Sequence, residues 1–129
     1  MAFSKIIGTK ISGITTVLPS NKEDNLELSA LNLSQKEELI KHTGIRFRRV
    51  AKEKEQSGKV LFKTGIEKLL QLLEWDKSSV DVLIIVTQTA QSPIPSLACK
   101  IHGEMNFSNQ KSAYDINSGC SGFVYGLHT

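Results

Sequence analysis

The chain has 129 residues and a net charge of +3, with 16 basic and 13 acidic residues, and 40% of its residues are hydrophobic. This composition is typical of one globular domain or part of one, and it excludes intrinsic disorder. The mild net charge does not by itself imply binding to nucleic acid. No apolar run approaches the roughly 18 residues that a membrane span needs, and the opening residues lack the pattern of a secretory signal. Two cysteines are too few for a disulfide framework, so we expect a cytoplasmic protein with free thiols.

The first third of the chain predicts one strand and one short helix. Residues 5–16 are rich in Ile and Thr and alternate loosely, which favours a strand. Ser34, with Glu37 three residues later, forms a capping-box pattern, so a helix is expected over residues 35–42. Gly44 follows where such a helix would end.

The rest of the chain alternates between helical and strand patterns. Apolar residues at helical spacing predict a helix over residues 57–74. The continuous apolar run at residues 82–86 predicts a strand buried on both faces, as in a parallel sheet covered by helices. A loop with two prolines leads into a helix expected over residues 95–105, and residues 112–116 form a second candidate buried strand. This order of elements is typical of an α/β layered fold.

Cys120 is the residue that most clearly suggests chemistry. It follows the second expected buried strand, where an apolar segment predicts a new helix, and Gly119 and Gly122 flank it closely. Small neighbours leave the thiol approachable, and a helix N-terminus favours the thiolate, which is the nucleophilic form. The alternative is a small buried filler, which is the usual role of a free cysteine. Cys99 lies among apolar residues of a helical pattern and is expected to pack in the core.

No histidine offers Cys120 a convincing base. His128 lies eight residues further along the same expected helix, and at about 1.5 Å per residue that is about 12 Å away, beyond hydrogen-bond reach. His102 is expected to pack or to face solvent. The sequence has no metal-ligand spacing, no paired carboxylates and no phosphate-binding glycine loop, so neither a metal nor another cofactor is expected.

Three sequence blocks resemble β-ketoacyl-ACP synthase III of the thiolase superfamily. They are HTGIRFRRVA at residues 42–51, the Pro95-Ser96 loop, and DINSGCSGF at residues 115–123. The resemblance extends over essentially the whole chain. It implies a thiolase-like α/β fold, in which residues 1–129 form the N-terminal, incomplete half of a duplicated α/β/α/β/α arrangement, truncated before the second half.

The resemblance implies an acyltransferase of fatty acid biosynthesis. Such an enzyme condenses an acyl-CoA or acyl-ACP primer with malonyl-ACP and releases CO2. Cys120 matches the nucleophile that the primer acylates, and its backbone N–H matches one oxyanion donor. The family's catalytic His and Asn lie outside these residues, so we expect the chain alone to be inactive in condensation. The expected partners are acyl carrier protein, the acyl thioester and, in the full-length enzyme, a second copy in a homodimer, with neither nucleic acid nor a membrane.

The resemblance also assigns substrate contacts to five further residues. Thr87 ends the strand that borders the active-site pocket, and Ile94 stands where the family has a bulky Phe that reaches into the partner's acyl tunnel. The smaller Ile94 leaves room for a longer or branched primer. Glu38 and His42 replace a Trp and an Arg at the CoA site, which favours an acyl-ACP primer or a specialised pathway. Arg46 and the two arginines after it fit either a solvated loop or a docking site for carrier protein or CoA phosphates.

Three alternatives stay open at the level of sequence. A related condensing enzyme, of the HMG-CoA synthase or polyketide starter type, would carry a similar run around Cys120. A non-catalytic half-module would bind a carrier protein or a partner chain that supplies the missing residues. A thiol-redox protein would need Cys99 close to Cys120, which no pattern indicates. An incomplete sheet would expose apolar surface, so dimerisation or aggregation is expected.

Overall fold

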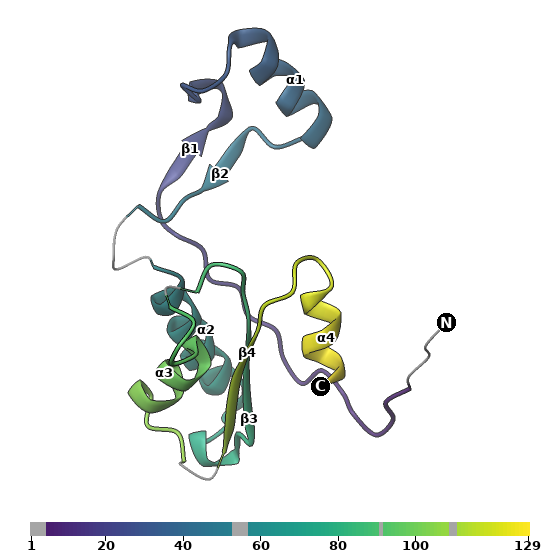
Figure 1. The fold of residues 1–129 in the computed structure, drawn as a ribbon, viewed down its shortest axis with the longest axis vertical. Helices are drawn as coiled ribbons and strands as arrows, with labels where there is room; N and C mark the ends of the chain where they lie inside the picture. Colours follow the sequence, from purple (N-terminus) through teal and green to yellow (C-terminus); the bar gives the residue numbers. More distant parts are fainter. Residues whose placement is uncertain (1–4, 53–56, 91, 109–110) are drawn as a thin grey trace. The chain divides into compact units, whose positions relative to one another are not determined.

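The computed structural model describes residues 5–52, 57–90, 92–108 and 111–129. These residues form two compact units (Figure 1), one drawn from the described residues up to Thr16 and from Phe62 onward, and the other from those within Val17–Leu61. None of the helices in the described ranges has both the length and the apolar character needed to cross a membrane.

The first unit is built on a two-stranded parallel sheet. β3 (Val82–Val86) and β4 (Ser112–Ile116) pair over their full length, with Ile85 opposite Asp115. α3 (Leu97–Glu104) connects them, as a crossover between parallel strands requires. Both strands are confirmed at the predicted bounds, and the predicted helix over residues 95–105 is confirmed with slightly shorter ends.

Helices lie on both faces of this sheet (Figure 1). α2 (Gly58–Leu73) and α3 lie on one face, where Leu83 and Ile85 of β3 are buried. α4 (Gly122–His128) contacts the other face. The prediction that β3 is buried on both faces is wrong for this second face. α4 packs on Val86, at the carboxyl end of the strand, while Val82 at the other end is 47% exposed.

The core of the first unit lies between the sheet and the helices α2 and α3. It contains alternate residues of β3, the inner face of α3 and the segment that follows α3: Leu83, Ile85, Leu97, Ala98, Ile101, Met105 and Phe107. α2 packs against this cluster through Phe62, Ile66 and Leu70. The helical spacing of these three residues confirms the prediction of an amphipathic helix over residues 57–74 to within one residue at each end.

Residues 5–16 form no strand in the described structure, so this prediction is wrong. The preference of Ile and Thr for strands acts through side chains on a neighbouring strand, and no described strand lies alongside this segment. Ile7 and Ile14 are exposed as a result. The segment does approach α2 at Gly13, where an added Cβ would lie 3.0 Å from Leu69 Cδ1.

The second unit contains a small antiparallel sheet and one helix. β1 (Lys22–Asp24) pairs with β2 (Phe47–Arg49), and α1 (Leu33–Thr43) lies between them in the sequence. Of the two alternatives for Arg46 and the arginines after it, the loop is therefore wrong over residues 47–49, which form β2. One aromatic and two basic residues in a row, Phe47–Arg49, show no strand periodicity by themselves. Only the pairing with β1 makes this segment a strand.

The start of α1 differs from the prediction by two residues. Asn32 is the N-cap in place of Ser34: its Oδ1 accepts a hydrogen bond from the Gln35 N–H at 3.0 Å. The Gln35 Oε1 accepts in turn from the Asn32 N–H at 3.0 Å. The Asn32–Gln35 spacing is thus the one that forms the capping box. Gly44 ends the helix as predicted, with a φ of 69° that favours glycine.

Candidate active site

The carboxyl ends of β3 and β4 lie side by side because the two strands are parallel. In α/β sheets, ligands bind outside these strand ends. Thr87 directly follows β3, and its backbone N–H donates to the Ile116 carbonyl at 3.1 Å. Its Oγ1 accepts from the Thr89 N–H at 3.2 Å, which shapes the beginning of the loop. The loops after β3 and β4 therefore start from one edge of the sheet.

A hollow of about 480 Å³ opens beside these strand ends. The loop after β3, the start of α3 and the end of β4 line it with mostly polar side chains, among them Thr87, Gln88, Ser92, Ser96, Asp115 and Asn117. Gln88 also borders the next turn, because a Cβ added to Gly119 would lie 3.7 Å from Gln88 Nε2. The turn that contains Cys120 thus adjoins the hollow, although Cys120 is not one of the lining residues.

Cys120 lies in the turn between β4 and α4, and its side chain is exposed. The Gly122 N–H donates to the Gly119 carbonyl at 2.9 Å, and the hydroxyls of Ser118 and Ser121 lie 3.0 Å apart across the same turn. Within the described ranges, no residue forms a hydrogen bond with the thiol or the backbone N–H of Cys120. The alternative of a buried filler is therefore wrong, and the thiol is open to a reagent.

None of the three histidines forms a hydrogen bond with the Cys120 thiol in the part of the chain that the structure describes. His128 lies on α4, as predicted, and His42 is exposed on α1 in the second unit. His102, on α3, stacks on Phe107 with the ring centroids 5.6 Å apart, so the packing prediction is the right one. Among the described residues, the exposed Cys120 thiol therefore has no hydrogen-bonded histidine beside it.

Cys99 is exposed, which contradicts the prediction that it packs in the core. Each helical residue is rotated by about 100° from the last, so the rotation that turns Leu97, Ala98 and Ile101 inward leaves Cys99 outside the buried face of α3. Its Sγ donates to the Ala113 carbonyl at 3.3 Å. Among the described residues, no three His, Cys, Asp or Glu side chains form a group that could hold a metal ion.

Ile94 lies in the loop between β3 and α3, with a proline on each side. Its side chain is 85% exposed. An apolar side chain in this position, close in sequence to the residues that line the hollow, is available for contact with a substrate or a second protein.

The three residues expected at the CoA site belong to the second unit. Glu38 and His42 are four residues apart on α1, so they share one face of the helix, and both are exposed. The Arg46 Nε donates to Asp24 Oδ2 at 3.1 Å. The Leu26 N–H, and then Arg46, hold the pKa of Asp24 below its ordinary value of 3.8. Arg46 is therefore already paired with a carboxylate.

The two arginines that follow also have partners within the second unit. Arg48 Nε donates to Asn25 Oδ1 at 2.6 Å, and its Nη2 donates to Glu23 Oε2 at 3.1 Å. Arg49 Nη1 donates to the Ser20 carbonyl at 2.6 Å. These contacts hold β2 to the preceding segment, so the three arginines are paired, although Arg46 and Arg49 remain exposed to solvent as in the solvated alternative.

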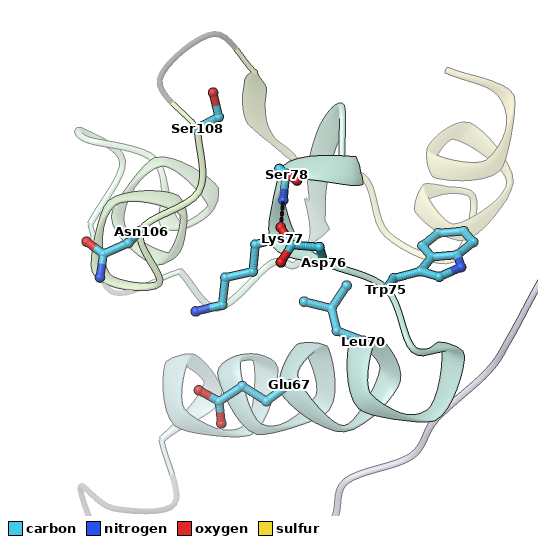
Figure 2. A pocket seen from close by; sticks show the side chains of 8 residues that line it. All are labelled: Glu67, Leu70, Trp75, Asp76, Lys77, Ser78, Asn106 and Ser108. Atoms are coloured by element: carbon cyan, nitrogen blue, oxygen red, sulfur yellow. Dashed lines mark hydrogen bonds between the residues drawn. The ribbon is translucent and has the colours of Figure 1, made fainter.

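A second hollow, of about 610 Å³, lies at the amino end of β3 (Figure 2). α2, the 3-10 helix η3 (Lys77–Ser79) and the segment after α3 line it. Its polar groups stabilise neighbouring elements: Asp76 Oδ1 accepts from the Ser78 N–H at 2.8 Å, and Lys77 Nζ donates to the Met105 carbonyl at 2.8 Å. None of the residues predicted for function lines this hollow, so the site is assigned to the strand ends.

Sequence reasoning missed Gln88 and Asp115, which both line the hollow at the strand ends. Asp115 carried a signal that could have been used. It is the one charged residue of β4, where a carboxylate between apolar neighbours needs hydrogen-bond donors close by. Gln88 carried no signal, because a glutamine in a loop is ordinary.

Solved structures identify the class of protein. A 3-oxoacyl-(acyl-carrier protein) synthase from Burkholderia xenovorans LB400 matches with a TM-score of 0.81 and 33% identity, covering 90% of this chain and 33% of that one. A 3-oxoacyl-[acyl-carrier-protein] synthase III from Aquifex aeolicus VF5 matches with a TM-score of 0.80 and 31% identity, covering 94% of this chain and 38% of that one. The priming β-ketosynthase of the R1128 polyketide pathway matches with a TM-score of 0.77 and 26% identity, covering 89% of this chain and 34% of that one. The chain has part of the thiolase-type α/β fold of these enzymes.

Curated relatives narrow the class. The β-ketoacyl-[acyl-carrier-protein] synthase III 2 of Bacillus cereus is 35% identical over 120 residues, which are 93% of this chain and 36% of the relative. The β-ketoacyl-[acyl-carrier-protein] synthase III 1 of Vibrio cholerae is 31% identical over 125 residues, which are 97% of this chain and 37% of the relative. No family model matches the chain. The resemblance is confirmed: the chain is a relative of β-ketoacyl-ACP synthase III and spans about a third of the length of these curated relatives.

Proposed function

We propose that Cys120 accepts an acyl group from a thioester, and that the chain carries the nucleophile of a decarboxylating condensing enzyme. The observation that carries the proposal is the exposed thiol in a glycine-flanked turn beside the carboxyl ends of β3 and β4. The similarity to synthase III over 93% of the chain supports it. That match extends over both units, so we treat residues 1–129 as one N-terminal thiolase-like domain.

In the proposed reaction, the Cys120 thiolate attacks the carbonyl carbon of an acyl-CoA or acyl-ACP. The new S–C bond forms as the bond to the CoA or carrier sulfur breaks, and the departing thiolate takes up a proton. The backbone N–H of Cys120 donates to the carbonyl oxygen as it gains charge. Malonyl-ACP then loses CO2, and its α-carbon attacks the acyl carbon, which frees Cys120 and forms a 3-oxoacyl-ACP.

Five further residues complete the proposed substrate contacts. Thr87 and Ile94 stand on the acyl side, near the hollow at the strand ends. Glu38, His42 and Arg46 stand on the CoA or carrier side. Arg46 would have to leave its carboxylate partner to bind a phosphate, and the Glu38 carboxylate would repel one. Both effects favour an acyl-ACP primer or a specialised pathway over an ordinary acetyl-CoA primer.

The partners and the location belong to the same proposal. The chain takes acyl carrier protein and an acyl thioester as substrates, works in a homodimer and needs no cofactor. A cytoplasmic location fits its two exposed free cysteines, because thiols stay reduced in that compartment.

Acylation of the chain by acyl thioesters tests the proposal. The chain is incubated with acetyl-, isobutyryl- and hexanoyl-thioesters of CoA and of acyl carrier protein, and intact mass spectrometry counts the acyl groups bound. We expect one acyl group, lost in Cys120→Ala and kept in Cys99→Ala, which removes the other exposed thiol. A chain that iodoacetamide alkylates at Cys120 but that no thioester acylates would rule the proposal out.

A second experiment asks whether the chain alone carries out the condensation that follows acylation. Because the resemblance places the family's catalytic His and Asn outside these residues, we expect the acylated chain to form no 3-oxoacyl-ACP from malonyl-ACP. Liquid chromatography with mass detection of the carrier protein measures the product. Turnover that disappears in Cys120→Ala would show that the 129 residues suffice, and the expectation of inactivity would be wrong.

A non-catalytic binding module is the second candidate. α4 favours it, because four of its apolar side chains are more than half exposed: Phe123, Val124, Tyr125 and Leu127. Contiguous exposed apolar side chains commonly mark an interaction surface. Light scattering after gel filtration, with and without acyl carrier protein, separates the two functions. A stable complex formed by a chain that is never acylated would favour the binding module.

A related condensing enzyme with a polyketide starter role is a variant of the first proposal. The 26% identity to the priming β-ketosynthase of the R1128 pathway favours it, although less strongly than the identity to synthase III favours a fatty acid role. The primer series above also distinguishes these roles, because a starter enzyme is expected to prefer the larger or branched thioesters.

A further inference from the structure

The side chain of Gln88 lies between the hollow at the strand ends and the turn that contains Cys120. Gln88 lines the hollow. The three atoms nearest to a Cβ built on Gly119 all belong to its amide group: Nε2 at 3.7 Å, Oε1 at 3.9 Å and Cδ at 4.0 Å. The amide end of this side chain, rather than its aliphatic stem, therefore faces the residue next to Cys120.

The amide of Gln88 has no hydrogen-bond partner in the part of the chain that the structure describes. Other polar groups nearby are paired. The Thr87 Oγ1 accepts from the Thr89 N–H at 3.2 Å, and the hydroxyls of Ser118 and Ser121 lie 3.0 Å apart. A glutamine amide offers two donor hydrogens and one acceptor oxygen. Gln88 therefore has a hydrogen-bonding capacity that the described fold does not use.

This amide is within reach of a group bound to the Cys120 thiol. The contact at Gly119 and the length of one residue of chain put Gln88 Nε2 at most about 9 Å from the Cα of Cys120. In an acyl group on the thiol, an oxygen on the third carbon lies up to about 7 Å from that Cα, and a hydrogen bond spans about 3 Å more. The Cys120 side chain is exposed, so the attached group is free to turn toward the amide.

We propose that Gln88 determines specificity at Cys120 for acyl groups with a hydroxyl or oxo oxygen on their third carbon. Such an oxygen pairs with the amide, whereas an apolar chain in the same place removes water from the amide and returns no hydrogen bond. Gln88 binds the substituent and takes no part in bond formation at the thiol. As a statement about acyl substrates, this inference rests on the proposed function of Cys120.

Two thiol reagents of equal size test the inference without any acyl transfer. 2-Hydroxyethyl and propyl methanethiosulfonate differ only in a hydroxyl against a methyl group, and each transfers its thioalkyl group to a thiolate as methanesulfinate leaves. The hydroxyl then lies as many bonds from Cys120 as an oxygen on the third carbon of an acyl group. Peptide mass spectrometry after reaction with an equal mixture gives the rate ratio at Cys120 and, as an internal reference, at Cys99.

Gln88→Met removes the amide but keeps an unbranched, flexible side chain of similar length. We expect the ratio of hydroxyethyl to propyl modification at Cys120 to fall about fivefold, which corresponds to about 1 kcal/mol, the contribution of one hydrogen bond. The ratio at Cys99 is expected to stay unchanged. A Cys120 ratio equal to that of the wild type, or an equal fall at Cys99, would overturn the inference.

Gln71→Met is the matched control. Gln71 is an exposed glutamine of α2 that lines neither of the two hollows. We expect its Cys120 ratio to stay within about twofold of the wild type. If this control lowers the ratio as much as Gln88→Met does, the effect does not come from the amide beside the turn, and the inference is overturned.

Two further arms keep the outcome decisive. If circular dichroism shows that Gln88→Met does not fold, Gln88→Leu replaces it, with the same fall expected and an unchanged ratio overturning the inference. 3-Hydroxybutyryl-CoA and butyryl-CoA are run in parallel, and their ratio of Cys120 acylation is expected to fall to the same extent. An acylation ratio that the variant leaves unchanged also overturns the inference. A wild type that both methanethiosulfonates modify but neither thioester acylates contradicts the proposed function, while the methanethiosulfonate ratio still decides the role of Gln88.

Discussion

A Cβ added to Gly122 would lie 2.6 Å from Cγ1 of Val86, so α4 and β3 approach more closely than a side chain at position 122 allows. A Cβ added to Gly126, one turn later, would lie 2.9 Å from Cγ2 of the same Val86. The two glycines therefore form the contact surface of α4 on β3. Because the Cys120 turn leads directly into α4, this contact also sets the position of Cys120.

Gly122→Ala is expected to destabilise the first unit and to slow alkylation of Cys120. Overpacking of this kind costs about 1–3 kcal/mol, and the stiff side chain of Val86 has little freedom to move away. Urea unfolding measures the loss, and Val86→Ala in the same chain is expected to recover part of it. Gly103→Ala is the control, since a Cβ there meets nothing within 4 Å and gains about 0.5–1 kcal/mol of helix propensity. Equal changes in stability in Gly122→Ala and Gly103→Ala would contradict the close contact between Gly122 and Val86.

Asn25→Ala is expected to destabilise the second unit by about 2 kcal/mol, because it leaves buried polar groups without partners. Asn25 is 3% exposed, its Nδ2 donates to the Ile45 carbonyl at 2.8 Å, and its Oδ1 accepts from Arg48. Hydrogen exchange of β1 and β2 measures the effect. Asn32→Ala removes the exposed N-cap of α1 and serves as the comparison. We expect it to lower the stability of the second unit by about 1 kcal/mol. A smaller effect at position 25 than at position 32 would show that the buried bonds contribute little.

The pKa of Asp24 is expected to stay low when Arg46 is replaced. The Leu26 N–H is the first cause of the low pKa and Arg46 a lesser one, so in Arg46→Gln the pKa should rise but remain below 3.8. A lowered folded-state pKa contributes stability above the unfolded pKa, and this is lost as the pH falls through the folded value. NMR titration of the side-chain carboxyl provides the measurement. A value of 3.8 or more in Arg46→Gln would show that Arg46 is the main cause.

Ile94→Phe is expected to change selectivity without changing stability. The side chain is 85% exposed, and substitutions at such positions shift stability by less than about 0.5 kcal/mol. If Ile94 limits the room for the acyl chain, as the resemblance implies, the larger Phe should slow acylation by hexanoyl-CoA more than acylation by acetyl-CoA, and Ile94→Ala should do the reverse. Thermal unfolding is the stability control. Identical rate ratios in both variants and the wild type would remove Ile94 from the substrate contacts.

Elements whose signal lies within a few adjacent residues were predictable from the sequence. The apolar run of β3 and the amphipathic spacing of α2 gave bounds that the structure matches to within one residue. Gly44 ended α1 as expected because a left-handed backbone favours glycine. The glycines around Cys120 marked the turn before α4, and the motifs shared with synthase III indicated the family.

Elements that depend on a distant partner were not predictable. Residues 5–16 have strand composition but no described strand beside them, whereas β2 has little strand composition and pairs with β1. Cys99 was placed in the core from its apolar neighbours, but the rotation of α3 decides which of them turn inward.

The sequence by itself determined the order of the elements in the first unit, the turn that presents Cys120 and the relationship to synthase III. Only the tertiary structure decided which side chains meet at the strand ends. Asp115 and Leu97 are 18 residues apart and become partners because β4 packs against α3. A hydrogen bond needs its donor and acceptor within about 3 Å, and that distance follows from the packing of whole elements rather than from the residues next to either group.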